Sequence, residues 1–307
     1  MKRFIHFITY SKAAPYIAAL LCVVSWCIRV EAKTLTGFLW LLCSLLVGYL
    51  LIKVNREFSL SDSKSLLPTT FYFMGCCMAP DLLAQHGAGV HIILFSLAGY
   101  VLLQTYRERY AMGRYFLAFT LIGIQCLLAP PLLLTFPWLV LCGTFMESLS
   151  ARSFFAALWG LLFPFWVAFG VLFLTDRMEV VAPYFEQVVS AVSTTLPPQP
   201  MSHWWNLLLW PLLIVLPGSI GILLNRTMKL QASAGFRLLI GALVVLFVTM
   251  WLSSVHYAVL LPCVWLIAAL IGSAMFTFSD SRAKNIYLIV LLLIWFSFWG
   301  LSLWNNF

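Results

Sequence analysis

Long apolar segments recur along almost the whole chain, and this pattern constrains the fold more than any other feature of the sequence. A membrane-spanning helix needs about 20 predominantly apolar residues. Polar breaks separate eleven candidate spans: Ala13–Ile28, Leu35–Ile52, Leu66–Leu83, Val90–Thr105, Tyr115–Ala129, Pro131–Phe145, Ser153–Leu174, Trp204–Leu224, Leu238–Val255, Tyr257–Phe276 and Ile286–Trp304. The sequence therefore predicts an all-α, polytopic transmembrane bundle that forms one membrane domain over residues 1–307.

Three of these candidates are unusual. Leu66–Leu83 contains Pro68, Pro80 and Asp81. The short segments Tyr115–Ala129 and Pro131–Phe145 share the Pro130-Pro131 break, so they form either a tight hairpin or a re-entrant pair.

The composition supports lipid as the main solvent. The 307 residues are 63% hydrophobic and only 9% charged, with a mean hydropathy of +0.99, whereas soluble domains are about 25% charged. The net charge of +8 does not indicate nucleic-acid binding, because the basic residues stand in short groups between apolar runs rather than in patches.

The basic residues also predict an orientation, since cytoplasmic loops are enriched in Lys and Arg. With the N-terminus inside, 15 of the 18 basic residues fall on the cytoplasmic side, and only Arg29, Lys33 and Arg177 fall outside. Eleven spans then place the C-terminus outside. We expect a multi-pass protein of the bacterial inner membrane.

The longest loop, 175–203, separates a seven-span part (13–174) from a four-span part (204–307). Within this predicted outer loop, Val181, Tyr184, Phe185 and Val188 recur at three- and four-residue intervals. Pro183 suits a first helical turn. The pattern predicts an amphipathic helix over Pro183–Val192 that lies in the membrane interface.

The familiar catalytic motifs do not occur. The sequence contains no P-loop, dinucleotide fingerprint, HExxH or GxSxG pattern, and its eight cysteines lie in apolar segments without metal-ligand spacing. The sequence motifs therefore leave the cofactor and any metal unknown.

A candidate site lies on the predicted outer side. An acid at the end of an apolar span is costly unless it faces water or a partner, and Asp81 has His86 and His91 nearby in the sequence. A carboxylate and imidazoles can orient a hydroxyl or phosphate, or bind a metal. Glu31, in the first outer loop, completes the candidate set; the competing interpretation is that these residues only cap helix ends.

The order of elements from about Leu66 to Leu174 supplies a resemblance. A span that ends in an acid is followed by another span, a basic turn, Pro130-Pro131 and the sequence Ser148-Leu149-Ser150-Ala151-Arg152. This order resembles the middle helices of GT-C-type, lipid-phosphosugar-dependent glycosyltransferases, and an uncharacterised family of Bacteroidota integral membrane proteins. GT-C enzymes carry a catalytic acid in a sizeable first outer loop, whereas the loop here is only Arg29–Thr34, with Glu31 as its single acid.

Three functional hypotheses follow. The first is a non-enzymatic subunit of an envelope assembly or secretion complex, whose helices dock other envelope membrane proteins. The second, which the resemblance implies, is the handling or transfer of a lipid-linked glycan at the outer face. The third is a transporter, although transport sites usually keep ionisable residues near the midplane. In each case the lipid bilayer is the main partner, and nucleic acid is not.

Overall fold

The computed structural model is a helical bundle, and it describes residues 9–29, 35–62, 64–80, 88–108, 110–193, 202–224, 228–252, 257–277 and 282–304. All regular secondary structure in these ranges is helical, which confirms the predicted all-α class. Five helices are long and apolar enough to cross a membrane: Gly37–Phe58, Ala151–Leu174, Leu230–Met250, Val259–Phe276 and Lys284–Leu301. The chain thus has the composition and helix lengths of a membrane protein, while eleven crossings and their orientation stay predictions.

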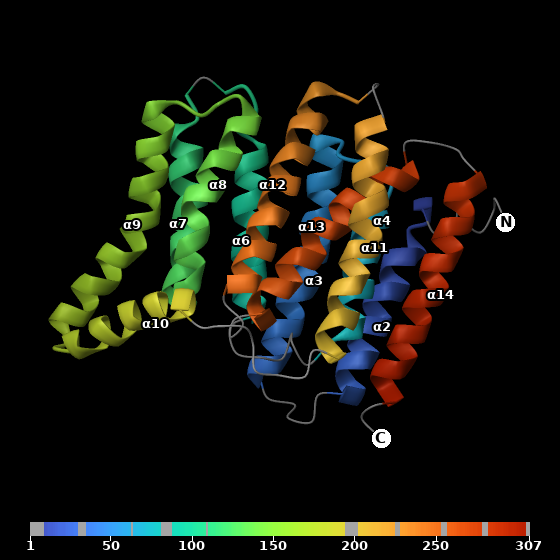
Figure 1. Ribbon diagram of the computed structural model, residues 1–307, viewed down its shortest axis with the longest axis horizontal. Coiled ribbons are helices and arrows are strands. Elements are labelled where there is room, and N and C mark those ends of the chain that lie inside the picture. Colours follow the sequence, from blue (N-terminus) through green and yellow to red (C-terminus); the bar gives the residue numbers. More distant parts are fainter. Residues whose placement is uncertain are drawn as a thin grey trace.

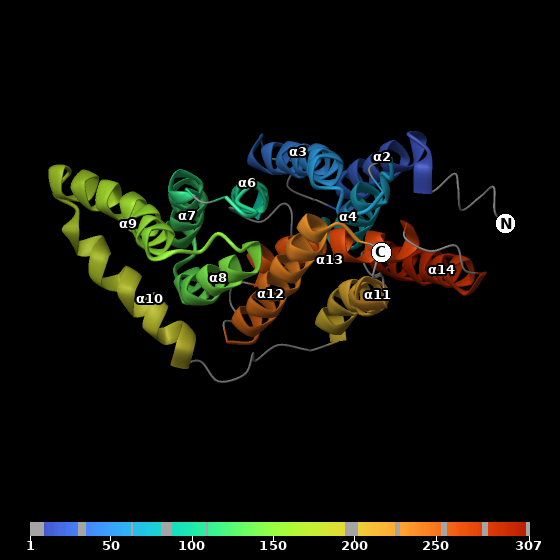
Figure 2. The same cartoon turned by 90° about the horizontal axis from the view of Figure 1, so that it is seen from above.

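The helices form two layers that run side by side (Figures 1 and 2). One layer holds α2 (Ala13–Arg29), α3 (Leu35–Phe58), α6 (Ala88–Leu103), α7 (Met112–Leu128) and α9 (Ala151–Leu174). The other holds α8 (Phe136–Cys142), α11 (Ser202–Leu224), α12 (Leu230–Leu252), α13 (Tyr257–Thr277) and α14 (Arg282–Trp304), and α4 (Leu67–Met78) lies between the two. Because α13 contacts α4, α6, α11 and α12, it is the central helix of the core.

Helix α4 is shorter than the predicted span Leu66–Leu83. It has twelve residues, all of them buried. At 1.5 Å per residue it is about 18 Å long, which is less than the roughly 30 Å of a hydrocarbon core. The part of the predicted span beyond residue 80 lies outside the described residues, so this crossing stays a prediction.

The segment after α7 is a composite of helix types. It begins as a 3-10 helix, η1 (Pro130–Thr135), continues as α8 and ends as η2 (Gly143–Met146). The hydroxyl of Tyr115, near the start of α7, donates to the Gly143 carbonyl at 3.3 Å, and the Arg107 backbone N–H donates to the Met146 carbonyl at 3.0 Å. The segment therefore returns to the end of the bundle where α7 begins, as in a tight hairpin.

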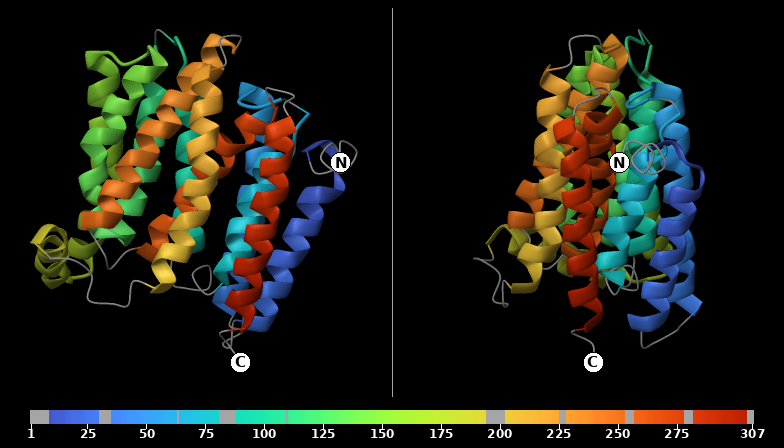
Figure 3. Two further views of the ribbon diagram at one scale, coloured as in Figure 1. Left: turned by 45° about the vertical axis from the view of Figure 1, so that its right-hand side comes forward. Right: turned by 90° about the vertical axis from the view of Figure 1, so that its right-hand side faces the viewer.

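Two helices mark opposite edges of the bundle. Helix α14 packs beside α2 at one edge, where the Trp299 indole N–H donates to the Ser25 hydroxyl at 2.8 Å (Figure 3). Helix α9 and the helix that follows it, α10 (Val181–Ser193), form the other edge. The turn between them contains Arg177, at the end of the bundle opposite the loops that carry Arg107 and Glu147.

This separation of the loops leads to a topology prediction. In intact spheroplasts, a membrane-impermeant maleimide should label Glu179→Cys, which follows α9, but should label Glu108→Cys, between α6 and α7, only after the membrane is permeabilised. The reason is that these residues lie in loops at opposite ends of the bundle. Labelling of the unmodified protein, which contains the exposed Cys27, is the background control. Equal labelling of both variants in intact cells would contradict the predicted orientation.

Candidate functional site

The residues predicted for an outer-face site are described only in part. Glu31, Asp81 and His86 lie outside the described residues. His91 is buried in the first turns of α6, and its backbone carbonyl accepts a hydrogen bond from the Gln125 side-chain amide of α7. The structure thus places one of the four residues, in the bundle interior, and the site that they would form together stays a prediction.

An apolar cleft with a volume of about 740 Å³ lies between α7, α9 and α10. Ligand pockets typically measure 300–1,000 Å³. Eight of its fourteen lining residues are aromatic; the full set is Phe116, Leu127, Trp159, Leu162, Phe163, Phe165, Trp166, Ala168, Phe169, Leu172, Val180, Val181, Tyr184 and Phe185. The cleft is therefore suited to an apolar ligand.

Two glycines and a proline explain why the cleft exists. Helices α7 and α9 cross closely, since a Cβ on Gly160 would lie 2.3 Å from the Phe116 carbonyl oxygen and one on Gly123 would lie 2.6 Å from that of Leu161. Just beyond this crossing, Pro164 lies inside α9, where a proline removes a backbone hydrogen bond and favours a bend. Figure 1 shows α9 diverging from α7 towards its C-terminal end. Close packing before Pro164 and divergence after it produce a wedge.

Helix α10 closes the wide end of this wedge. This helix, Val181–Ser193, includes the residues Pro183–Val192 that the sequence predicts to be helical. It lies across the direction of the bundle helices (Figures 1 and 2). The Tyr184 hydroxyl donates to the Cys126 carbonyl of α7 at 2.8 Å, and the Tyr184 ring packs edge-on against Phe165 at 5.9 Å. Burial raises the pKa of Tyr184, so the phenol stays a neutral donor and ties α10 to α7.

The depth of the cleft matches one leaflet of a bilayer. Phe116 and Leu127, which line it on α7, are eleven residues apart, or about 16 Å along a helix. Half of a hydrocarbon core is about 15 Å. A single hydrocarbon chain that begins at the level of α10 can therefore extend along the full depth of the cleft.

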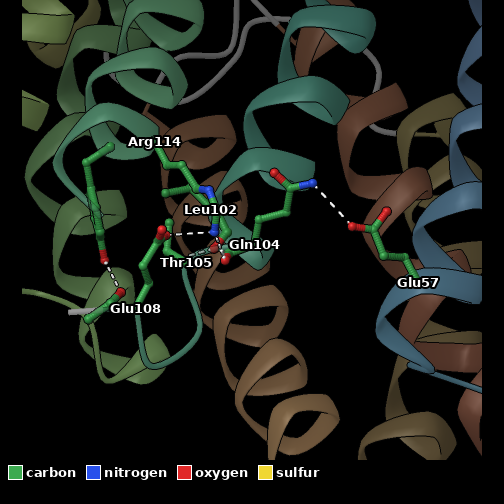
Figure 4. A network of polar contacts seen from close by, with 8 residues as sticks. Glu57, Leu102, Gln104, Thr105, Glu108 and Arg114 are labelled. Carbon is green, nitrogen blue, oxygen red and sulfur yellow. Dashed lines mark hydrogen bonds and ion pairs between the residues drawn. The ribbon is translucent and has the colours of Figure 1, made fainter. Parts of the chain in front are cut away.

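A polar network lies at the opposite end of the bundle (Figure 4). Glu57 of α3 accepts hydrogen bonds from the Tyr100 hydroxyl at 2.8 Å and from the Gln104 amide at 3.2 Å, which bridges α3 to the end of α6. Glu108 of the following loop pairs with Arg114, in the first turn of α7, at 2.7 Å. These contacts lie at neighbouring ends of α3, α6 and α7.

A second ion pair lies in the same region. Arg107 pairs with Glu147 at 2.7 Å, and this hydrogen bond and charge raise the pKa of Arg107. Both side chains are about half exposed, and exposed ion pairs contribute little to stability. In both ion pairs the charged groups already have a partner within the protein. We therefore interpret this region as a structural connection between loops rather than as a binding site.

Comparisons with protein-family models, with curated proteins and with solved structures found no match. Among the described residues, no group of three or more His, Cys, Asp or Glu side chains is arranged to hold a metal ion. The cleft is thus the candidate site that the geometry supports, and it was not predicted from the sequence. The only local signals were Pro164 and the density of aromatic residues in Ala151–Leu174.

Proposed function

We propose that the protein is an inner-membrane protein that holds the hydrocarbon chain of a lipid or lipid-linked substrate in the cleft between α7, α9 and α10. The observation that carries this proposal is a cavity of about 740 Å³ lined by apolar and aromatic side chains. Its depth, near that of one leaflet, and the helix across its wide end suit a chain whose polar head stays at the interface. The predicted orientation puts that head at the outer face.

This proposal develops the hypothesis of lipid-linked substrate handling. The alternative hypothesis, a non-enzymatic subunit of an envelope assembly or secretion complex, draws on the apolar surface of α9 outside the cleft, where Phe173 is 67% and Leu174 84% exposed. Membrane lipid can cover that outer surface equally well. The concave cleft is more specific, because a flat lipid-facing helix does not require a cavity behind it.

The proposal is tested by filling the cleft. Ala168 lines it, whereas its neighbour Val167 does not and is half exposed. We expect native mass spectrometry of the purified, detergent-washed protein to show one retained lipid per chain. Ala168→Trp should reduce the lipid-bound fraction about tenfold, because the indole occupies the space of the chain.

Val167→Trp is the matched control, since it adds the same indole one residue away on the exposed surface of α9. It should retain lipid like the unmodified protein. No retained lipid in the unmodified protein, or equal losses in both variants, would contradict a specific chain site. Co-purification of a stoichiometric membrane protein that Val167→Trp displaces would instead favour the subunit hypothesis.

A further inference from the structure

A group of sulfur and hydroxyl side chains lies in the core between α2 and α4, on the side of the bundle away from the cleft. Helix α2 packs on α4, and Cys22 of α2 and Cys76 and Cys77 of α4 are neighbouring side chains at this contact, all three of them buried. Cys77 also donates to the Ala18 carbonyl at 3.8 Å. Three thiols from two helices thus meet at one point of the helix interface.

Two hydroxyl side chains lie near these thiols, although apolar side chains could fill the same space. Ser25 lies one turn after Cys22, and its hydroxyl donates to the Leu21 carbonyl and accepts from Trp299. The hydroxyl of Tyr72, one turn before Cys76, is fully buried beside the Cys76 thiol. Small hydrophobes would fill this space without burying any hydroxyl.

We propose that Cys22 forms a reversible disulfide with one cysteine of the Cys76–Cys77 pair, so that oxidation links α2 covalently to α4. Adjacent residues of a helix have side chains that point in different directions, which disfavours a Cys76–Cys77 bond. Both, however, face Cys22, so Cys22 is the common partner. The remaining thiol can then attack the disulfide and move it between the two partners without a change in oxidation state.

The oxidation has a defined balance. Two S–H bonds break, one S–S bond forms, and two electrons and two protons pass to a two-electron acceptor. The proposed acceptor is a membrane-soluble quinone, which is reduced to the quinol. An acceptor that dissolves in lipid is appropriate because α2 is an edge helix, with Tyr16, Leu20 and Val24 exposed on its outer surface, while the thiols lie behind that surface.

This disulfide would fix the position of a short helix, α4. Helix α4 has twelve residues, and one of its attachments is the hydrogen bond from the Trp295 indole to the Met74 carbonyl at 2.8 Å. A covalent bond to α2 would restrict its position in the bundle. The inference is independent of the cleft, which lies between other helices, and neither proposal depends on the other.

The experiment uses the full chain in lipid nanodiscs, treated with a fully substituted benzoquinone, which cannot add thiols at an open ring position. After denaturation and alkylation, mass spectrometry should show the loss of two free thiols per chain. A non-reduced digest should contain the Cys22 peptide joined to the peptide of Cys76 and Cys77, and dithiothreitol should restore both thiols.

Cys22→Ala should abolish the joined peptide. Cys126→Ala, which removes a buried thiol from α7, should leave it unchanged. An unchanged thiol count in the unmodified protein, or a loss of two thiols that persists in Cys22→Ala, would overturn the proposal. The first measurement needs no variant, so a folding defect in Cys22→Ala does not affect it.

Discussion

Gly160→Leu is expected to separate α9 from α7 and to lower stability by about 3 kcal/mol or more, since overpacking a close contact costs about 1–3 kcal/mol and here the obstacle is backbone. A Cβ at this position would lie 2.3 Å from the Phe116 carbonyl oxygen and 3.1 Å from its Cα. Side chains can rotate away from such a clash, but the backbone of α7 can yield only if the two helices move apart. The cleft, which depends on their crossing, should be lost as well.

The same helix supplies a matched control. A Cβ on Gly170 would meet nothing within 4 Å, so Gly170→Leu adds the same side chain without a clash. Melting temperatures in detergent, followed with a dye that fluoresces on reaction with newly exposed thiols, should fall by several degrees for Gly160→Leu. Gly170→Leu should stay near the unmodified protein or above it, because leucine favours helix more than glycine does. Similar melting temperatures for the two variants would show that the crossing is not tight.

The class of the fold follows from the sequence because lipid leaves few solutions. A chain with recurrent apolar segments must satisfy its backbone hydrogen bonds within each segment, so helices result. The amphipathic spacing around Tyr184 and Phe185 correctly predicted helix α10, and Pro130-Pro131 correctly predicted a break after α7. These features are local, and local patterns can be read directly from residue order.

The features that the sequence did not predict arise from contacts between helices. Hydropathy alone could not show that α4 ends at Met78, since its buried residues are as apolar as those of a spanning helix. The cleft needs Gly160 to face Phe116 and α9 to diverge after Pro164. Likewise, Cys22 is more than fifty positions from Cys76 in the sequence, and only the packing of α2 on α4 brings their thiols together.

The connection between α3 and α4 depends on a single buried amide. Asn55 donates hydrogen bonds to the carbonyls of Asp62 and Ser65, at 3.1 and 3.0 Å, and accepts two from Ser61, each 2.8 Å long. Ser65 in turn donates to the Thr9 carbonyl at 3.2 Å. The amide therefore holds the turn that follows α3, and through this turn the residues just before α2.

Asn55→Leu should destabilise the protein by about 3 kcal/mol, since each buried polar group left without a partner costs roughly 1–3 kcal/mol and the change takes the amide from the Ser61 N–H and the Ser65 carbonyl. The Asp62 carbonyl, by contrast, still accepts from the Ser65 N–H. Ser44→Ala is the control on the same helix. Ser44 is fully buried like Asn55, but its hydroxyl donates to the Leu41 carbonyl within α3. This carbonyl lies in the helix interior, where the backbone supplies its usual donor, so the change should cost less than about 1 kcal/mol. The same thiol-reactive melting assay should rank Asn55→Leu well below Ser44→Ala. Equal melting temperatures would mean that water replaces the amide, and that the turn between α3 and α4 is held by its apolar contacts instead.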